Sequence, residues 1–481
     1  MKLLEAVCGI PVARSRPLLT ILKENDVLRE ERHSHQVLYA FTHSLLRDAA
    51  YDSLLRRRRR ELHKRTADAL VGKFIAVVAS RPELVAYHWM QAGELELAVV
   101  AWERAGNFAV SRRAFTEAER AYRKALIALA DLGPSPEHDS KALALQSLLA
   151  DSLRITRGFS AQETVEATAR ARALADRNGD RAQQFLQMWG QWTAASSGGN
   201  HVAAIKLANE FYRLASLDGG TESLAHAHMI QMTSRYRIGD LLGAEDHFKK
   251  GEQFFADPDF SRRPGVIAQT YGNAARIGWI IGDDSAAQRR IDHALTVAGE
   301  NNNPYDLAYA DYMAAIHFVL LERFGEAVAF AEGSIRLSDE HAFPQFAAIS
   351  RVALGRAQVG LGFVSEGATL IREGLGRMAD NSVRVALTLY MTWLAEGLLR
   401  AELFTEALAA VRDALRANPQ ELFFRPESLR LCGEILARMG AAGEAESNFL
   451  EALALSSRMA ARRFRDRATR SLEMLLVGRA A

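Results

Sequence analysis

Small and apolar residues recur along most of the chain with a fixed spacing. The recurring unit is a triplet at positions i, i+4 and i+7, in which the outer residues are small and the middle residue is apolar in the clearest copies. Residues at this spacing share one face of a helix. The first members of the triplets are Ala118, Thr164, Ala204, Ala244, Ala287, Ala327, Gly367, Ala407 and Ala445. Successive first members are 46, 40, 40, 43, 40, 40, 40 and 38 residues apart, a register that predicts a repeat array.

A second small residue precedes most of these triplets by twelve positions, as at Gly106 and Gly433. Trp192 and Met232 occupy the equivalent positions in two copies. The two small positions predict a pair of antiparallel helices that cross where side-chain bulk is excluded. Prolines suited to the first turn of a helix stand 40 residues apart at Pro264, Pro304 and Pro344.

In its small-residue spacing, the unit resembles the tetratricopeptide repeat, although its period is near 40 residues instead of about 34. We expect about nine helical hairpins over residues 94–457, followed by a C-terminal capping helix at 458–481. One helical pair cannot bury both of its apolar faces, so neighbouring pairs stack. The pattern therefore predicts an all-α, tetratricopeptide-like solenoid whose first helices line a concave face.

Aromatic residues fall on the predicted first helices, where they are candidates for an interaction surface. These residues are Trp189, Trp192, Tyr236, Trp279 and Tyr312. Large aromatic side chains more often pack between repeats, and the pattern favours that interpretation for most of them. The other interpretation is a groove that binds a peptide, a protein segment or a small effector.

Residues 1–80 lack the repeat and predict a different module. A short helix over residues 15–24 is followed by two apolar segments, 27–28 and 37–41, that flank a polar turn and indicate a β-hairpin. Two further helices follow, and this order predicts a winged-helix-like module. Residues 81–93 are expected to form a helix that bridges the module to the repeats.

Charge is concentrated in this first module. The whole chain carries 60 Lys and Arg against 58 Asp and Glu, a net charge of +2, whereas residues 1–80 carry a balance of +6. Five consecutive arginines, Arg56, Arg57, Arg58, Arg59 and Arg60, suggest a possible interaction surface and invite a DNA-binding interpretation. Base readout needs polar side chains on a recognition helix, and none is evident. We therefore favour a solvated helix face and expect no nucleic-acid partner, with a DNA-contacting regulator as the alternative.

Residues 41–55 (FTHSLLRDAAYDSLL), 60–63 (RELH) and 82–89 (PELVAYHW) resemble a segment of bacterial signal-transduction ATPases of the STAND type. Many of these regulators also carry a class III adenylate or guanylate cyclase domain. The resembling segment joins their ATPase module to a repeat arm. The resemblance implies that this chain is the sensor half of such a regulator, encoded separately or truncated. It also implies an ATPase or cyclase module as a possible partner in cis or in trans.

The motifs of ATPase, cyclase and metal chemistry are not recognisable in the sequence. Gly72-Lys73 lacks the glycine-rich loop that cradles phosphates. His226 and His228 stand two residues apart on a predicted helix and point to different faces, so they would not share one metal ion. We therefore predict no catalytic residue, no cofactor and no metal. A truncated cyclase-family protein without its catalytic part is a further alternative.

Hydrophobic residues make up 49% of the chain and charged residues 25%, a composition typical of a folded globular protein. No stretch of 18 uninterrupted apolar residues is present, so we expect no membrane-spanning helix and a cytoplasmic location. Together these features predict a non-catalytic interaction or sensor arm of a bacterial signal-transduction or transcriptional regulator. Its partner, a peptide, protein or small effector, is expected on the concave repeat face.

Overall fold

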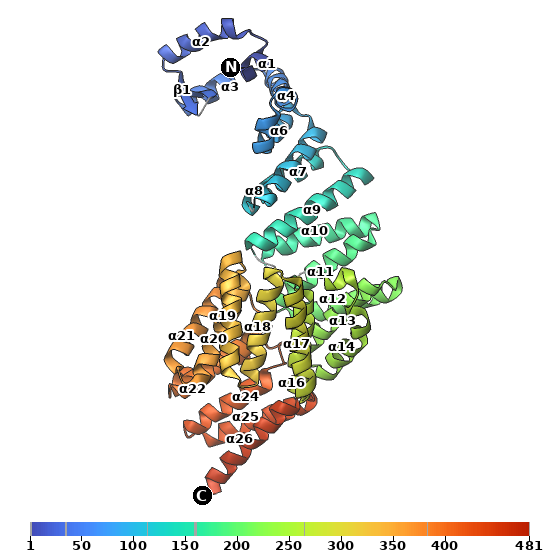
Figure 1. Cartoon of the computed structure of the whole chain (residues 1–481), viewed down its shortest axis with the longest axis vertical. Helices are drawn as coiled ribbons and strands as arrows, with labels where there is room; N and C mark the ends of the chain where they lie inside the picture. Colours follow the sequence, from blue (N-terminus) through green and yellow to red (C-terminus); the bar gives the residue numbers. More distant parts are fainter. Residues whose placement is uncertain are drawn as a thin grey trace. The chain divides into compact units, whose positions relative to one another are not determined.

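The computed structural model describes residues 2–33, 36–112, 114–157, 161–263, 265–381 and 383–480. Within these ranges the chain forms 26 α-helices and one two-stranded sheet (Figure 1). Its contacts divide it into two compact units. Unit 1 comprises Met1–Arg157 with Glu163–Gln187, and unit 2 comprises Gly158–Gln162 with Met188–Ala481.

Unit 1 begins with a β-hairpin between short helices. The elements are α1 (Lys2–Cys8), α2 (Val12–Glu24), β1 (Leu28–His33), β2 (Gln36–Phe41) and α3 (Ser44–Asp52). The strands pair antiparallel from Leu28 opposite Phe41 to His33 opposite Gln36. The hairpin prediction is therefore confirmed, but most of the expected polar turn belongs to the strands, and residues 34–35 lie outside the described part. Leu19 is the only buried apolar side chain among the described residues up to 55, and the winged-helix-like arrangement stays a prediction.

The rest of unit 1 is a stack of helices with a continuous core. They are α4 (Arg56–Lys73), α5 (Ile75–Ser80), α6 (Pro82–Ala92), α7 (Leu95–Ser111), α8 (Phe115–Asp131), α9 (Pro136–Arg157) and α10 (Gln162–Asn178). Trp89, Trp102 and Tyr122 are buried in this core. A side chain at Gly106 would collide with the ring of Tyr122. The small residue predicted twelve positions before a triplet is therefore required by the crossing of α7 and α8.

Unit 2 continues the helical pairs, and the division between the units falls within α11. Its helices are α11 (Arg181–Ser197), α12 (His201–Asp218), α13 (Thr221–Arg237), α14 (Leu241–Phe255), α15 (Pro258–Ser261), α16 (Val266–Ile281), α17 (Asp284–Asn301), α18 (Pro304–Leu320), α19 (Phe324–His341), α20 (Pro344–Leu361), α21 (Val364–Asp380), α22 (Leu387–Arg400), α23 (Phe404–Ala417), α24 (Arg425–Arg438), α25 (Ala442–Arg458) and α26 (Arg462–Ala480). Pro304 and Pro344 open α18 and α20 as predicted. Pro264 lies outside the described residues.

The predicted triplets form the closest contacts within each helical pair. Ala407, Val411 and Ala414 are fully buried on α23. On α20, a Cβ atom added to Gly355 would lie 2.5 Å from the backbone oxygen of Gly367 on α21. Exclusion of bulk at these positions lets the two helices touch through their backbones, and the all-α solenoid predicted from the spacing is confirmed.

Hydrogen bonds between successive first helices repeat the same period. The Trp192 indole N–H donates to the Ser234 hydroxyl at 2.8 Å, across 42 residues. The Arg356 guanidinium pairs with the Glu396 carboxylate across 40 residues. Residues at equivalent positions of neighbouring repeats are thus in direct contact, so the first helices lie side by side and form one inner layer.

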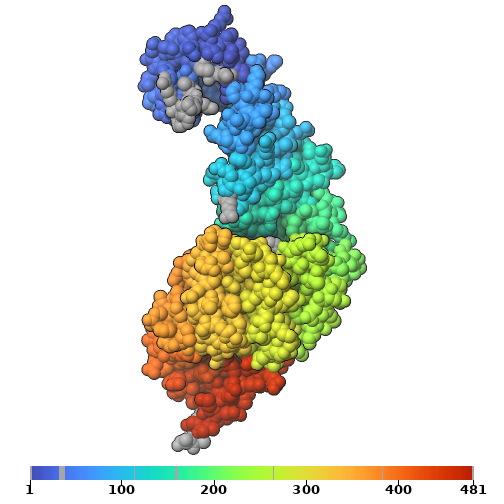
Figure 2. Space-filling view, in the orientation of Figure 1, coloured from blue at the N-terminus to red at the C-terminus, as the bar shows by residue number. Residues whose placement is uncertain are grey.

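In unit 2 the chain itself covers part of this inner layer. The backbone N–H of Leu422, between α23 and α24, donates to the carbonyl oxygen of Arg237 on α13 at 2.9 Å. The Arg384 N–H likewise donates to the carbonyl oxygen of Ser197 at 2.9 Å. We call residues 418–424 the covering segment. On the face seen in Figure 2, residues 188–480 form a continuous surface.

None of the helices that the structure describes is both long and apolar enough to cross a membrane.

Candidate functional site

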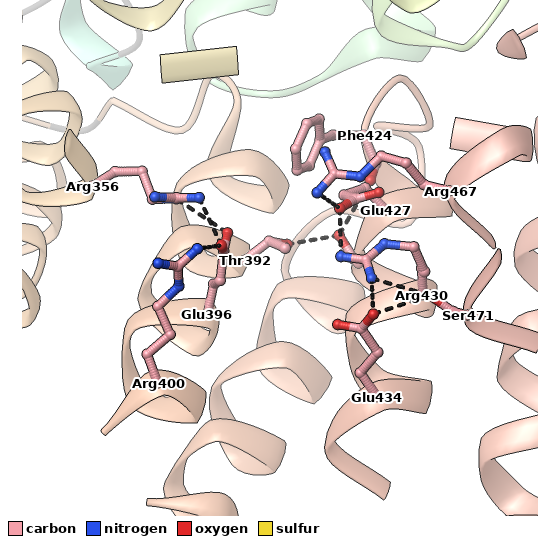
Figure 3. Close-up of polar contacts among 11 residues, drawn as sticks. Arg356, Thr392, Glu396, Arg400, Phe424, Glu427, Arg430, Glu434, Arg467 and Ser471 are labelled. Carbon is pink, nitrogen blue, oxygen red and sulfur yellow. Dashed lines mark hydrogen bonds and ion pairs between the residues drawn. The ribbon is translucent and has the colours of Figure 1, made fainter. Parts of the chain in front are cut away.

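A cluster of arginine and glutamate side chains lies where the last four first helices of unit 2 meet. Its members are Arg356 on α20, Glu396 and Arg400 on α22, Glu427, Arg430 and Glu434 on α24, and Arg467 and Ser471 on α26 (Figure 3). Each helix contributes its residues about one repeat further along the chain. The repeat therefore builds the site by placing equivalent helix positions next to one another. We call this set the Arg–Glu cluster.

Glu396 is the centre of one half of the Arg–Glu cluster. Arg356 donates to both of its carboxylate oxygens, from Nη2 at 2.6 Å and from Nε at 3.1 Å. Arg400 donates to the same carboxylate at 3.3 Å. The guanidinium of Arg356 also lies over the ring of Phe324, 5.2 Å from its centroid. This bidentate geometry holds Arg356, which is only 4% exposed, in one orientation.

Glu427 is the centre of the other half. Arg430 donates to its Oε1 atom at 2.7 Å, and Arg467 approaches the same atom at 3.2 Å. Burial raises the pKa of Glu427, but Arg430 and Arg467 outweigh it and bring the pKa down to about 2. Arg430 also pairs with Glu434, which accepts a hydrogen bond from Ser471 at 2.9 Å. Glu427 therefore stays ionised at neutral pH and is poorly suited to proton transfer.

A small cavity of about 20 Å³ opens between the two halves, enough for about one water molecule. Three charged atoms of the cluster are buried without a hydrogen-bond partner: Arg356 Nη1, Arg430 Nε and Glu427 Oε2. Two of them are donors and one is an acceptor. The cavity also meets Glu322, so four arginines face four glutamates. The site as a whole is neutral and fits a group that both donates and accepts.

The five arginines singled out in the sequence begin α4. Arg56, Arg57, Arg58 and Arg60 are exposed, whereas Arg59 is half-buried. Arg59 binds Asp52 at 3.0 Å, and its guanidinium lies 4.9 Å from the centroid of the Tyr51 ring. Arg59 thus fastens α4 to α3, and the other four form a solvated face in unit 1.

Most of the aromatic candidates lie in the interior of unit 2. Trp192, Tyr236, Trp279 and Tyr312 are 0–7% exposed. Trp189 is half-buried and packs edge-on against His226, with ring centroids 5.0 Å apart. The first four therefore serve as packing residues in this structure, since neighbouring first helices and the covering segment surround them.

The Arg–Glu cluster was missed in the sequence although a signal for it exists. Arg356 and Glu396 occupy the same register one period apart, as do Arg430 and Arg467 within a few residues. Opposite charges at a separation of one repeat predict contact between first helices. Sequence alone does not distinguish this buried arrangement from exposed ion pairs such as that of Arg372 and Glu406.

His226 and His228 contact different neighbours, as their spacing predicts. His226 packs against Phe260 at a centroid distance of 4.8 Å. His228 lies against His247, with 3.2 Å between their Nδ1 atoms. In the described part of the chain, no three potential metal ligands come together.

Buried histidines predict a loss of stability in mild acid. Burial lowers the pKa of His88, His226, His247 and His317 to about 4. The unfolded chain binds protons at these groups below pH 6.5 and the folded chain does not, so the free energy of unfolding falls from pH 6.5 towards pH 4. For His317, which is fully buried, the slope is about 1.4 kcal/mol per pH unit. Urea unfolding at pH 7, 6 and 5 measures it.

His317→Leu provides the matched control for this pH dependence. The variant should show a shallower dependence than the native chain between pH 6.5 and pH 5, because one buried titrating group is removed. A native chain whose unfolding free energy is flat over that interval would contradict the prediction.

Comparison with known proteins identifies no family. No family model matches the chain. A curated relative, the uncharacterized protein R02095 of Rhizobium meliloti (strain 1021), is 27% identical over 173 residues, which is 36% of this chain and 17% of that protein. The chain therefore matches less than a fifth of the length of that relative.

Three solved structures are similar at low identity. A Rap protein complexed with competence and sporulation factor is 11% identical, over 70% of this chain and 99% of that one, with a TM-score of 0.45. The Cut9–Hcn1 hetero-tetramer of APC/C is 12% identical, over 89% and 87%, with a TM-score of 0.45. A tetratricopeptide repeat protein from Parabacteroides merdae ATCC 43184 is 12% identical, over 60% and 99%, with a TM-score of 0.36. The solenoid assignment rests on the repeat contacts of this chain.

Proposed function

We propose that the chain is a non-catalytic interaction scaffold that binds a protein or peptide partner at the Arg–Glu cluster. The observation that carries the proposal is the set of unpartnered atoms around the cavity: Arg356 Nη1, Arg430 Nε and Glu427 Oε2. Leaving such buried charged atoms unpaired costs free energy. A ligand group that satisfies them gains that free energy on binding.

The chemistry of these atoms selects an amide. A peptide group or the carboxamide of Asn or Gln offers one carbonyl acceptor for a guanidinium and one N–H donor for Glu427. The charges of the Arg–Glu cluster are balanced, so no charged ligand is favoured. The size of the cavity admits one such group at a time, which fits a single anchor residue of a longer segment that lies across the rim.

By the resemblance of residues 41–89, this scaffold serves as the sensor arm of a STAND-type regulator in the cytoplasm. Its partner would then be a protein segment or an ATPase or cyclase module, in cis or in trans. The support is the sequence resemblance together with the two free cysteines, Cys8 and Cys432, which agree with a reducing compartment.

Selection from a displayed peptide library tests the binding proposal. Peptides selected on the native chain are expected to bind Arg356→Met at least tenfold more weakly, because the variant removes the donor Nη1 and frees Glu396. The matched control is Arg351→Met on the same helix. Arg351 pairs with Asp339 at 2.8 Å, away from the cavity, so its loss should leave binding unchanged.

A library that yields no selective peptide would refute the proposed site. Equal losses in Arg356→Met and Arg351→Met would refute it too, since they would show a general effect on the fold. Isothermal titration of the selected peptides gives the affinities for both comparisons.

A further inference from the structure

Two buried guanidinium groups on the inner layer of unit 2 lack the partners that such groups require. Arg237, at the end of α13, is 5% exposed, and Arg276, in the middle of α16, is 1% exposed. A buried charge costs several kcal/mol unless a counter-charge or a full set of hydrogen bonds accompanies it. The surroundings of these two side chains therefore carry information about what else the interior holds.

Another buried arginine of the same unit shows the usual solution. Arg290 donates to both oxygens of Glu245, at 2.7 and 2.9 Å. By contrast, no described residue forms an ion pair with Arg237 or Arg276, and Arg237 Nε, Arg237 Nη1 and Arg276 Nε have no hydrogen-bond partner. Arg276 Nη2 contacts the thioether of Met313, a weak acceptor.

One carboxylate faces this region, and its hydrogen-bonding capacity is already used. Glu421, in the covering segment, is 0% exposed. It accepts hydrogen bonds from the backbone N–H groups of Ala386 at 2.8 Å and Thr388 at 3.1 Å. Its Oε1 atom also lies 3.4 Å from Nε2 of His201. Two guanidinium charges thus face a single carboxylate, and at least one positive charge is left without a counter-charge.

The other groups around Arg276 are neutral donors. Burial raises the pKa of the Tyr236, Tyr312 and Tyr390 hydroxyls, so these groups stay protonated. The Tyr236 hydroxyl has no hydrogen-bond partner, and neither ring nitrogen of His317 has one. Burial lowers the pKa of His317 to about 4, and Arg276 adds to this effect. The interior offers N–H and O–H donors around an uncompensated positive charge.

We propose that the interior of unit 2 binds a small monovalent anion, of the size of chloride, beside the guanidinium of Arg276. The anion supplies the missing negative charge and accepts hydrogen bonds from Arg276 Nε and from the Tyr236 hydroxyl. The closed packing of the region, where Tyr236 and Tyr390 are at most 1% exposed, selects a small ion and excludes sulfate. Because the region joins first helices to the covering segment, the bound anion stabilises the covered form of the inner layer.

Thermal unfolding of the full chain in different sodium salts tests the proposal. At equal sodium concentration, chloride and bromide are expected to raise the unfolding temperature above its value in gluconate, saturably and by about 3–6 °C. Sulfate should not reproduce the saturable rise. Replacing Arg276 with methionine removes the unpaired charge, so the Arg276→Met variant should fold and lose the rise.

Arg290→Met is the matched control, because Arg290 is equally buried but paired with Glu245. This variant should unfold at a lower temperature in every salt and keep the response to chloride. Identical unfolding temperatures in chloride and gluconate would overturn the proposal. An undiminished response in Arg276→Met, or an equal response to sulfate, would overturn it as well.

Crystals grown in sodium bromide provide a readout that does not depend on any variant. A peak of anomalous scattering beside the Arg276 guanidinium is expected, at a position that the Tyr236 hydroxyl can also reach. Well-diffracting crystals without such a peak would refute the site even if the unfolding temperature depended on the anion.

Discussion

Replacing Gly355 with alanine is expected to lower the free energy of unfolding of unit 2 by about 2–3 kcal/mol. The new Cβ atom would lie 2.5 Å from the carbonyl oxygen of Gly367 and 2.9 Å from the backbone nitrogen of Ile371. Both obstacles are backbone atoms, so α20 and α21 must move apart, as in an overpacked core. Urea unfolding followed by circular dichroism measures the loss.

The same substitution at Gly376 is the control. Gly376 lies inside α21, and an added Cβ atom would meet nothing within 4 Å. Gly376→Ala should therefore stabilise the chain by about 0.5–1 kcal/mol, since alanine is the better helix former. Similar effects of the two substitutions would contradict the helix crossing described above.

Replacing Arg290 with methionine is expected to destabilise unit 2 by about 3–5 kcal/mol. The substitution leaves Glu245, only 7% exposed, without its bidentate partner. It also removes the hydrogen bond from Arg290 to the carbonyl oxygen of Ala274 and the contact with the Phe248 ring, whose centroid lies 4.1 Å from the guanidinium. Chemical denaturation at pH 7 measures the effect.

A double variant tests whether the unpaired carboxylate is the cause. Replacing Glu245 with leucine in the Arg290→Met background removes the buried charge, so most of the lost stability should return. A double variant as unstable as Arg290→Met alone would show that packing, and not the unpaired charge, accounts for the loss.

The repeat was predictable because its cause is local. Where two helices of a pair cross, the backbone permits only small residues, and the same crossing recurs about every 40 residues. Gly106 and Gly355 show this directly, since an added Cβ atom at either position meets the neighbouring helix. Periodic exclusion of bulk is visible in a single sequence, so the helical pairs and their order follow from it.

The fate of the inner layer was not predictable in the same way. Whether Tyr236 or Trp279 faces a ligand or the chain depends on how strongly the stack curves, and curvature sums small rotations at every repeat. Leu422 reaches Arg237 only because of that sum. The cluster around Glu396 and Glu427 and the unpaired charge at Arg276 depend on the same closure, so neither leaves a local pattern in the sequence.

The covering segment has a consequence for how unit 2 folds. In an open array each repeat touches only its neighbours, so repeats gain structure one after another and fray from the ends. Here Asn418 binds the carbonyl oxygen of Gly199, and Arg463 binds that of Trp279, across 219 and 184 residues. Pairings so distant along the chain slow the search for the native state. They also make the first and last hairpins of unit 2 depend on one another, so that it behaves as one cooperative body and not as a string of separable modules.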